Sequence, residues 1–217
     1  MTAQPVHHLS DPGTSITDLG TVAPVRALML EVPESLLAER RRLGHDRFDE
    51  MWEGVLHMVP PPMFSHQGLG SKLFVLLASW ASPVGLEAFY EIGVFDPAVP
   101  DYTSYRQPDL LVAHPEVFSA RGIEGAAHLA IEIRSPNDES FEKLPFYERV
   151  GVREFLIIDQ TDLTIHHWTN GPDGFEPSLA GGGQPVPIAC LATSIQAVGE
   201  QLRFEHGGVV TEIPFAG

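Results

Sequence analysis

Long apolar runs and cysteine are both scarce in this chain. It has no stretch of 18 or more consecutive apolar residues, the length that a membrane-spanning helix needs. Its first residues lack the basic start and apolar centre of a signal peptide. The single cysteine, Cys190, cannot form an internal disulfide, which agrees with a reducing compartment. We therefore expect a cytoplasmic protein without a membrane partner.

Basic residues are also few, since 13 lysines and arginines stand against 29 aspartates and glutamates, for a formal net charge of −16. This balance argues against binding of nucleic acid through a generally basic surface, because such binding depends on cations that neutralise phosphates. Arg40, Arg41, Arg42 and Arg47 nevertheless crowd one segment. A locally basic groove and a solvated surface of mixed charge both remain open.

The residues that are present suffice for one domain. A length of 217 residues with 43% hydrophobic residues can bury a sizeable core. Residues 1–25 are rich in Pro, Ser, Thr, Gly and His without periodicity, so we predict a flexible N-terminal arm there. Residues 26–217 are predicted to form a single domain.

The hydrophobic pattern predicts helices and strands in mixed order. Helices are expected over 33–44, from Ser65 as a cap to about Trp80, and over 138–151. A hairpin is expected around residues 52–54, and strands over 86–95, 108–113, 128–135 and 154–159, with shorter strands over 164–168, 174–179, 186–190 and 201–204. This order predicts a mixed α+β fold with a central mixed sheet flanked by helices and an extra antiparallel strand region.

One acid stands inside an apolar strand. In HLAIEIRS the strand period places Leu129, Ile131 and Ile133 on one face and Glu132 with Arg134 on the other. A buried glutamate needs a partner or a cation, because burying an unpaired charge is costly. The competing interpretation is a Glu132–Arg134 salt bridge on a solvent-facing sheet surface.

A second acid, Asp109 in QPDLLVA, opens the preceding strand. It lies near Glu132 if the two strands are neighbours, as strands adjacent in sequence usually are. Two close carboxylates favour a divalent cation, and Mg²⁺ (or Mn²⁺) takes one or two protein carboxylates with water and phosphate oxygens. Taken alone, Asp109 is also a typical turn residue after Pro108.

The order of these residues resembles a nuclease signature. Pro108-Asp109, followed after 23 positions by Glu132-Ile133-Arg134, is similar to the PD-(D/E)XK pattern. With the segments FDEMWEGVLHMVPPPMFSHQGLGSKL and LAIEIRSPNDESFEKLPFYERVGVREFLIIDQ, residues 34–170 resemble the bacterial family of restriction-endonuclease-like proteins. The resemblance implies a restriction-endonuclease-like domain with DNA as substrate. It also implies metal ligands Asp109, Glu132 and the carbonyl of Ile133, and a metal-activated water that attacks the phosphodiester.

The chain departs from this signature at its lysine. Arg134 fills the lysine position, where it can neutralise charge but is too basic to exchange a proton near neutral pH. Lys143 resembles the family's recurrent lysine and is expected to serve from the next helix, with a solvated helix lysine as the alternative. Tyr147 lies four residues on and shares a helix face with Lys143 if Pro145 does not break the helix. We therefore predict catalytic roles for Asp109, Glu132, Arg134 and Lys143.

Weaker candidates are Glu53 at the hairpin tip, Glu91 in the strand over 86–95, His66 at a helix start, and Tyr147. Each acid is more typical of a surface position, and His66 is equally typical of a capping or packing role. The leading hypothesis is a Mg²⁺-dependent endonuclease acting on DNA. Alternatives are a non-catalytic interaction module on the same fold and a small-molecule metal phosphodiesterase. A homodimer is expected by analogy, because double-strand cutting needs two sites.

Overall fold

The computed structural model describes residues 31–136, 138–178 and 183–216. The described residues from Val32 onward belong to one compact unit. The predicted arm, residues 1–25, lies outside the described residues, so both it and the predicted domain boundary stay predictions.

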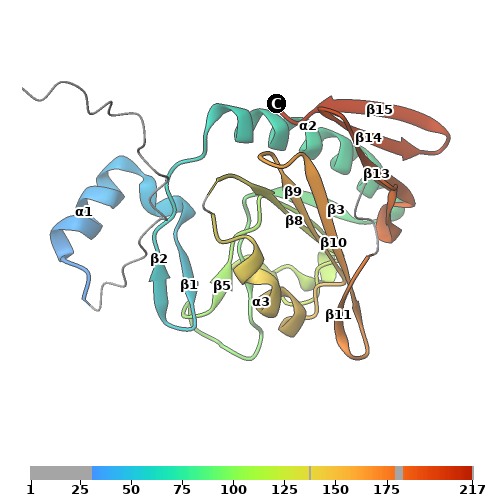
Figure 1. Ribbon diagram of the computed structural model, residues 1–217. Helices are drawn as coiled ribbons and strands as arrows, with labels where there is room; N and C mark the ends of the chain where they lie inside the picture. Colours follow the sequence, from blue (N-terminus) through green and yellow to red (C-terminus); the bar gives the residue numbers. More distant parts are fainter. Residues whose placement is uncertain (1–30, 137, 179–182, 217) are drawn as a thin grey trace, which may run out of the picture. The chain divides into compact units, whose positions relative to one another are not determined.

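A six-stranded mixed sheet forms the centre of this unit (Figure 1). Its strand order is β11 (Gly174–Pro177), β10 (Thr164–Gly171), β9 (Glu154–Asp159), β8 (Leu129–Arg134), β6 (Leu110–Ala113) and β3 (Glu87–Tyr90). β8 and β9 pair in parallel and the other neighbours are antiparallel. β6 and β9 are buried along their whole length, as expected of apolar runs covered on both faces. The predicted mixed sheet is confirmed.

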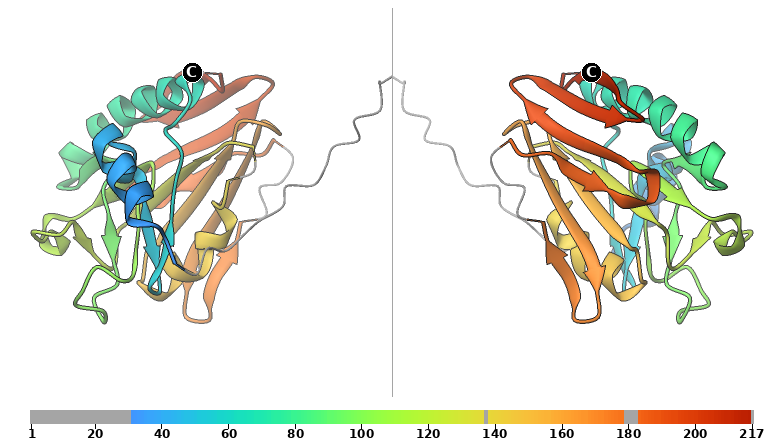
Figure 2. Two further views of the ribbon diagram at one scale, coloured as in Figure 1. Left: turned by 90° about the vertical axis from the view of Figure 1, so that its left-hand side faces the viewer. Right: turned by 90° about the vertical axis from the view of Figure 1, so that its right-hand side faces the viewer.

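One face of the central sheet packs against α2 (Phe64–Ala81) and a second sheet. Leu69, Leu73 and Leu77 of α2 recur at helical spacing and are buried in this layer. The second sheet is antiparallel, in the order β12 (Val186–Ile188), β13 (Thr193–Val198), β14 (Gln201–His206) and β15 (Val209–Pro214). Figure 2 shows its strands beside α2 and the central sheet. The predicted antiparallel extension is therefore present.

The opposite face carries the short helix α3 (Leu144–Arg149) and a third sheet. That sheet runs in the order β2 (Val55–His57), β1 (Glu50–Trp52), β5 (Tyr105–Arg106), β4 (Val94–Phe95) and β7 (Ile123–Glu124). β1 and β2 form the predicted hairpin. Helix α1 (Glu34–Leu43) buries none of its side chains and ends at Gly44 in the left-handed conformation, as predicted.

Three predicted elements differ from the structure. The strand over 86–95 breaks at Glu91, whose φ of 51° lies in the left-handed region, so β3 and β4 join different sheets. Ser65 does not cap a helix, because α2 already begins at Phe64 and Met63 holds the cap position. The helix over 138–151 is a 3-10 turn, Phe141–Lys143, followed by α3. Strands β13 and β15 were not predicted.

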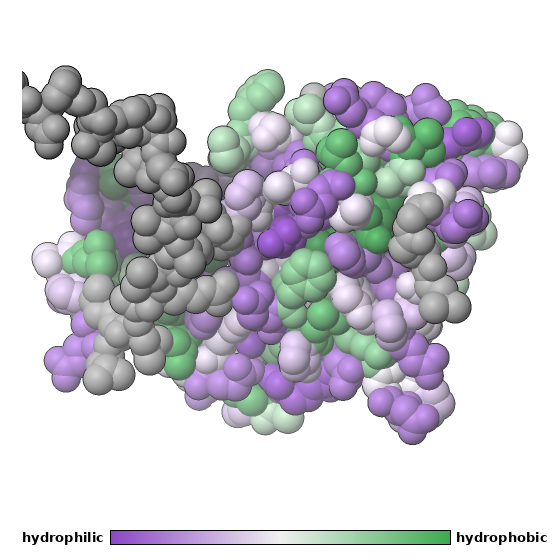
Figure 3. All heavy atoms as spheres, in the orientation of Figure 1, coloured by the Kyte–Doolittle hydropathy of each residue, from purple (hydrophilic) through white to green (hydrophobic). Residues whose placement is uncertain are grey.

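The surface of the described residues carries both hydrophilic and hydrophobic side chains. On the face drawn in Figure 3, hydrophilic and hydrophobic residues are interspersed. Among the helices of the described residues, none combines the length and the apolar character needed to cross a membrane.

Candidate active site

The two predicted acids lie on neighbouring strands. β6 and β8 are antiparallel with Leu110 opposite Ile131, so the next position outward places Asp109 opposite Glu132. Directly opposite residues of an antiparallel pair point to the same face. The predicted strand adjacency is confirmed. Glu132 is only 4% exposed, on the face that carries α3, whereas Ile131 packs in the α2 layer.

A buried lysine joins Glu132 to another acid. The Nζ of Lys143 lies 2.8 Å from Oε1 of Glu50 and 3.0 Å from each carboxylate oxygen of Glu132. Tyr147 is fully buried, and its hydroxyl donates to Oε1 of Glu132 at 2.9 Å. Lys143 is therefore not a solvated helix lysine. The competing interpretation, a Glu132–Arg134 salt bridge on a solvent-facing surface, is wrong, since Glu132 is buried and pairs with Lys143.

Pro145 does not separate Lys143 from Tyr147. Lys143 ends the 3-10 turn, and Pro145 occupies one of the first positions of α3, where its missing N–H breaks no helical hydrogen bond. The backbone passes from one helix type to the other without leaving the helical region at Leu144. Both side chains consequently reach Glu132.

Glu50 was missed by sequence reasoning. It is buried at 2% exposure on β1 and accepts hydrogen bonds from the main-chain N–H of Gln107 and the indole of Trp52, each at 2.7 Å. It is 93 positions from Lys143 in sequence. Only the pairing of β1 with β5 carries it to the site, and no local pattern in FDEM signals that.

Asp109 is fixed by donors from two elements. Its Oδ2 accepts the main-chain N–H of Ile133 at 2.6 Å, and Nε2 of His66 lies 3.3 Å away. The main chain at Ile133 thus borders the Asp109 carboxylate. His66, a weaker candidate, comes from the first turn of α2, and its Nδ1 is buried without a hydrogen-bond partner among the described residues.

Burial and neighbouring charges shift the pKa values of several groups in this cluster. Burial raises the pKa of Glu132 to about 8, with further upward contributions from Asp109 and Glu50 and a downward one from Lys143. Burial works to lower the pKa of Lys143, but the two carboxylates outweigh it and the pKa is raised, so the lysine stays charged. Burial likewise works to lower the pKa of His66, and the neighbouring Asp109 carboxylate more than offsets this.

The remaining predicted residues have other partners. Arg134 forms an ion pair with Asp159 on β9, and its guanidinium lies 5.4 Å from the ring centroid of Phe141. Glu53 pairs with two arginines, Arg106 and Arg149. Glu91 accepts a hydrogen bond from Gln67. The structure therefore brings Asp109, Glu132, Ile133, Lys143, Tyr147 and His66 together, and places Arg134, Glu53 and Glu91 in separate pairs.

The donors of the cluster suit a hard divalent cation. As the side chains stand, no group of three or more His, Cys, Asp or Glu within the described ranges is arranged to hold a metal ion. Mg²⁺ does not require such a group, because it usually binds one or two protein carboxylates and keeps several waters. Asp109 and Glu132 supply carboxylate oxygens from neighbouring strands, and the repulsion from Asp109 and Glu50 that adds to burial in raising the pKa of Glu132 would be relieved by a bound cation. The residues fit the ion.

Comparisons with known proteins bear on the family and the fold of this chain. A model of the family described as "Uma2: Putative restriction endonuclease" matches residues 37–196. The fold is similar to a crystal structure of a putative nuclease belonging to DUF820 from Anabaena variabilis, with a TM-score of 0.54 and 19% identity over 66% of this chain and 83% of that chain. A cryo-EM structure of a DrdV–DNA complex has a TM-score of 0.30 and 10% identity over 70% of this chain and 10% of that chain. No curated protein matches the chain. The predicted restriction-endonuclease-like fold is confirmed.

Proposed function

Since this chain belongs to the Uma2 family of putative restriction endonucleases, we propose that it is a Mg²⁺- or Mn²⁺-dependent endonuclease that hydrolyses phosphodiester bonds in DNA. The family and the fold support a nuclease-like function. The observation that carries the finer proposal is the buried contact of Lys143 with Glu132, on the strand that pairs with the one directly after Asp109.

Asp109, Glu132 and the carbonyl of Ile133 would hold the ion. When bound, the ion supplies charge stabilisation to the phosphoryl group and activates water. Tyr147 keeps the Glu132 carboxylate in place through its hydrogen bond. Lys143, which contacts both carboxylate oxygens of Glu132, would lie beside an ion held there and would supply positive charge to a phosphate oxygen.

Lys143 acts through its charge in this proposal. Its raised pKa keeps the ammonium protonated, so it stabilises negative charge and does not accept a proton from water. Arg134 remains engaged with Asp159, so the lysine position of the signature is served by Lys143 from the following turn.

The test is cleavage of plasmid and single-stranded DNA with Mg²⁺ or Mn²⁺. We expect activity in the wild type, loss of at least about 100-fold in Asp109→Asn, Glu132→Gln and Lys143→Met, and no change in the control Glu176→Gln, an exposed acid on β11. Equal cleavage by all variants would contradict the proposal. Cleavage of a small chromogenic phosphodiester but not of DNA would identify a small-molecule phosphodiesterase instead.

A second candidate is a non-catalytic interaction module on the same fold. The crowded arginines favour it, because Arg40, Arg41 and Arg42 each pair with an acid of the chain and form no free basic patch. If the chain is such a module, adding Mg²⁺ or Mn²⁺ should leave the melting temperature unchanged, whereas a metal site raises it once the metal concentration exceeds its Kd. The homodimer and the cytoplasmic location stay predictions.

A further inference from the structure

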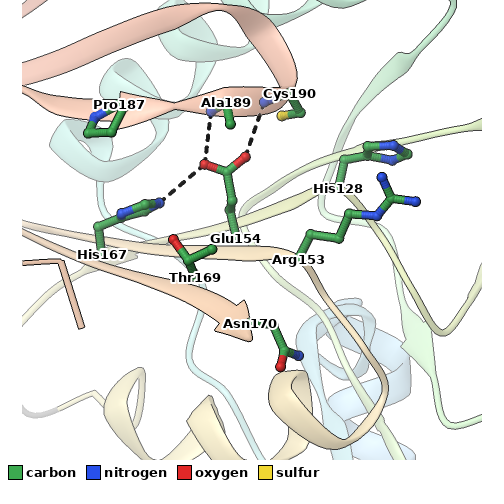
Figure 4. A pocket seen from close by; sticks show the side chains of 9 residues that line it. All are labelled: His128, Arg153, Glu154, His167, Thr169, Asn170, Pro187, Ala189 and Cys190. Carbon is green, nitrogen blue, oxygen red and sulfur yellow. Dashed lines mark hydrogen bonds and ion pairs between the residues drawn. The ribbon is translucent and has the colours of Figure 1, made fainter. Parts of the chain in front are cut away.

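A pocket separate from the Glu132 cluster opens where the central sheet meets β12 (Figure 4). Its volume is about 470 Å³, within the range of small-molecule sites. It is lined by His128, Arg153, Glu154, His167, Thr169, Asn170, Pro187, Ala189 and Cys190. Glu154 pairs with Leu129 at the start of β8, while Glu132 lies three residues further along and on the opposite sheet face. The pocket is therefore not part of the candidate active site.

Arg153 and His128 lie side by side at one end of this pocket in Figure 4. Their backbones are tied together: Arg153 N–H donates to the carbonyl of Ala127, and Glu154 N–H to that of His128, at 3.0 and 3.1 Å. Arg153 is exposed, and its guanidinium forms no ion pair or hydrogen bond within the described residues. The Nδ1 of His128 is buried and likewise lacks a partner there.

The acid of the pocket does not neutralise Arg153. Glu154 accepts hydrogen bonds from the N–H groups of Ala189 and Cys190, at 3.0 and 3.1 Å, and lies 3.3 Å from Nε2 of His167. Figure 4 shows this carboxylate directed at those partners, away from the guanidinium. An unpaired guanidinium beside an imidazole with an unpaired nitrogen gives this end of the pocket the local chemistry that suits an anion, although the chain as a whole is acidic.

We propose that this pocket binds a small organic carboxylate, with its head between Arg153 and His128 and its apolar body against Pro187 and Ala189. A carboxylate matches the single fixed cation. His128 adds no second charge near neutral pH, because burial and the neighbouring Arg153 lower its pKa. A phosphate dianion would be left with an uncompensated charge close to Glu154.

The probe is 2-naphthoate, titrated into the full chain and followed by the amide resonances of Thr169, Ala189 and Cys190. Its neutral isostere 2-naphthamide and the dianion 2-naphthyl phosphate serve as comparisons. We expect 2-naphthoate to shift these resonances and to bind about tenfold more tightly than the amide, since its carboxylate pairs charge with charge at Arg153 whereas the amide offers only a neutral carbonyl.

Arg153→Gln is expected to weaken 2-naphthoate binding about tenfold without changing the melting temperature, because Arg153 is exposed and unpaired. The matched control is Arg203→Gln, which removes an exposed arginine on β14 and leaves affinity unchanged. The proposal is overturned if the three resonances do not respond, if Arg153→Gln binds like the wild type, or if the amide or the phosphate binds as tightly as the carboxylate.

Discussion

Replacing Lys143 with methionine is expected to destabilise the fold. The substitution keeps most of the apolar volume but removes the ammonium from three carboxylate oxygens within 3.0 Å. The side chains of Glu50 and Glu132 are 2% and 5% exposed, so neither gains water in exchange. Removing one partner of a buried ion pair costs about 3–5 kcal/mol, because the other charge remains buried.

The loss of unfolding free energy should lie at the lower end of this range, about 3 kcal/mol at pH 7, because Glu132 can take up a proton. Its pKa is already about 8 beside Lys143 and rises further without it. A group whose pKa is higher in the folded than in the unfolded state contributes stability at low pH that is lost as pH rises towards the folded value. The variant therefore loses more stability at pH 9 than at pH 6.

Urea unfolding followed by tryptophan fluorescence, with EDTA present, measures this free energy. Lys72→Met is the matched control, since Lys72 is exposed on α2 and its replacement should cost little. The double variant Lys143→Met with Glu132→Gln should regain part of the loss, because one buried charge disappears with its partner. A loss of unfolding free energy below about 1 kcal/mol for Lys143→Met would refute the claim that its buried ion pairs stabilise the fold.

Three further outcomes are expected. Glu154→Gln should cost about 1–3 kcal/mol in urea unfolding, because a buried acceptor of two main-chain N–H groups is weakened. Burial works to raise the pKa of Glu154, but its hydrogen bonds lower it overall. The wild type should therefore lose this stability as pH falls below about 4.5. The unfolding free energy of the variant should depend less on pH in that acidic range. Arg134→Gln should lower stability by about 1 kcal/mol through Asp159 and leave DNA cleavage near the wild-type rate in a plasmid assay. Gly70→Ala should lower the melting temperature, with a cost of about 1–3 kcal/mol, because the added methyl would lie 2.6 Å from the Tyr90 hydroxyl.

Features of the fold that depend on local sequence patterns could be predicted from the sequence. The alternation in LAIEIR placed Ile131 and Glu132 on opposite faces, and the structure buries them in different layers. Chain order alone suggested that the strands of Asp109 and Glu132 are neighbours, which the β6–β8 register confirms. These predictions succeed because side-chain direction in a strand depends only on residue parity.

Contacts set by distant pairing were not predictable. Glu50 reaches Lys143 only through the β1–β5 pairing, across 93 sequence positions. The segment over 86–95 predicts one strand because most of its residues are apolar or aromatic, and the two glutamates, Glu87 and Glu91, do not mark a break. Its break depends on Glu91 in a left-handed conformation, held by the bond from its N–H to the carbonyl of Asp109. Such a conformation is uncommon for a residue with a side chain, so no local signal announces it.

The register of β8 and β9 explains why an arginine occupies the lysine position. The parallel pair sets Arg134 beside Asp159, whose other oxygen accepts the N–H groups of Thr161 and Asp162 at the end of β9. A guanidinium there joins the ends of two central strands by an ion pair, and this holds it away from Glu132. The cation beside Glu132 must then come from another element, and the turn before α3 delivers Lys143. Arg134 therefore joins the ends of two strands of the sheet, and Lys143 places the positive charge beside Glu132.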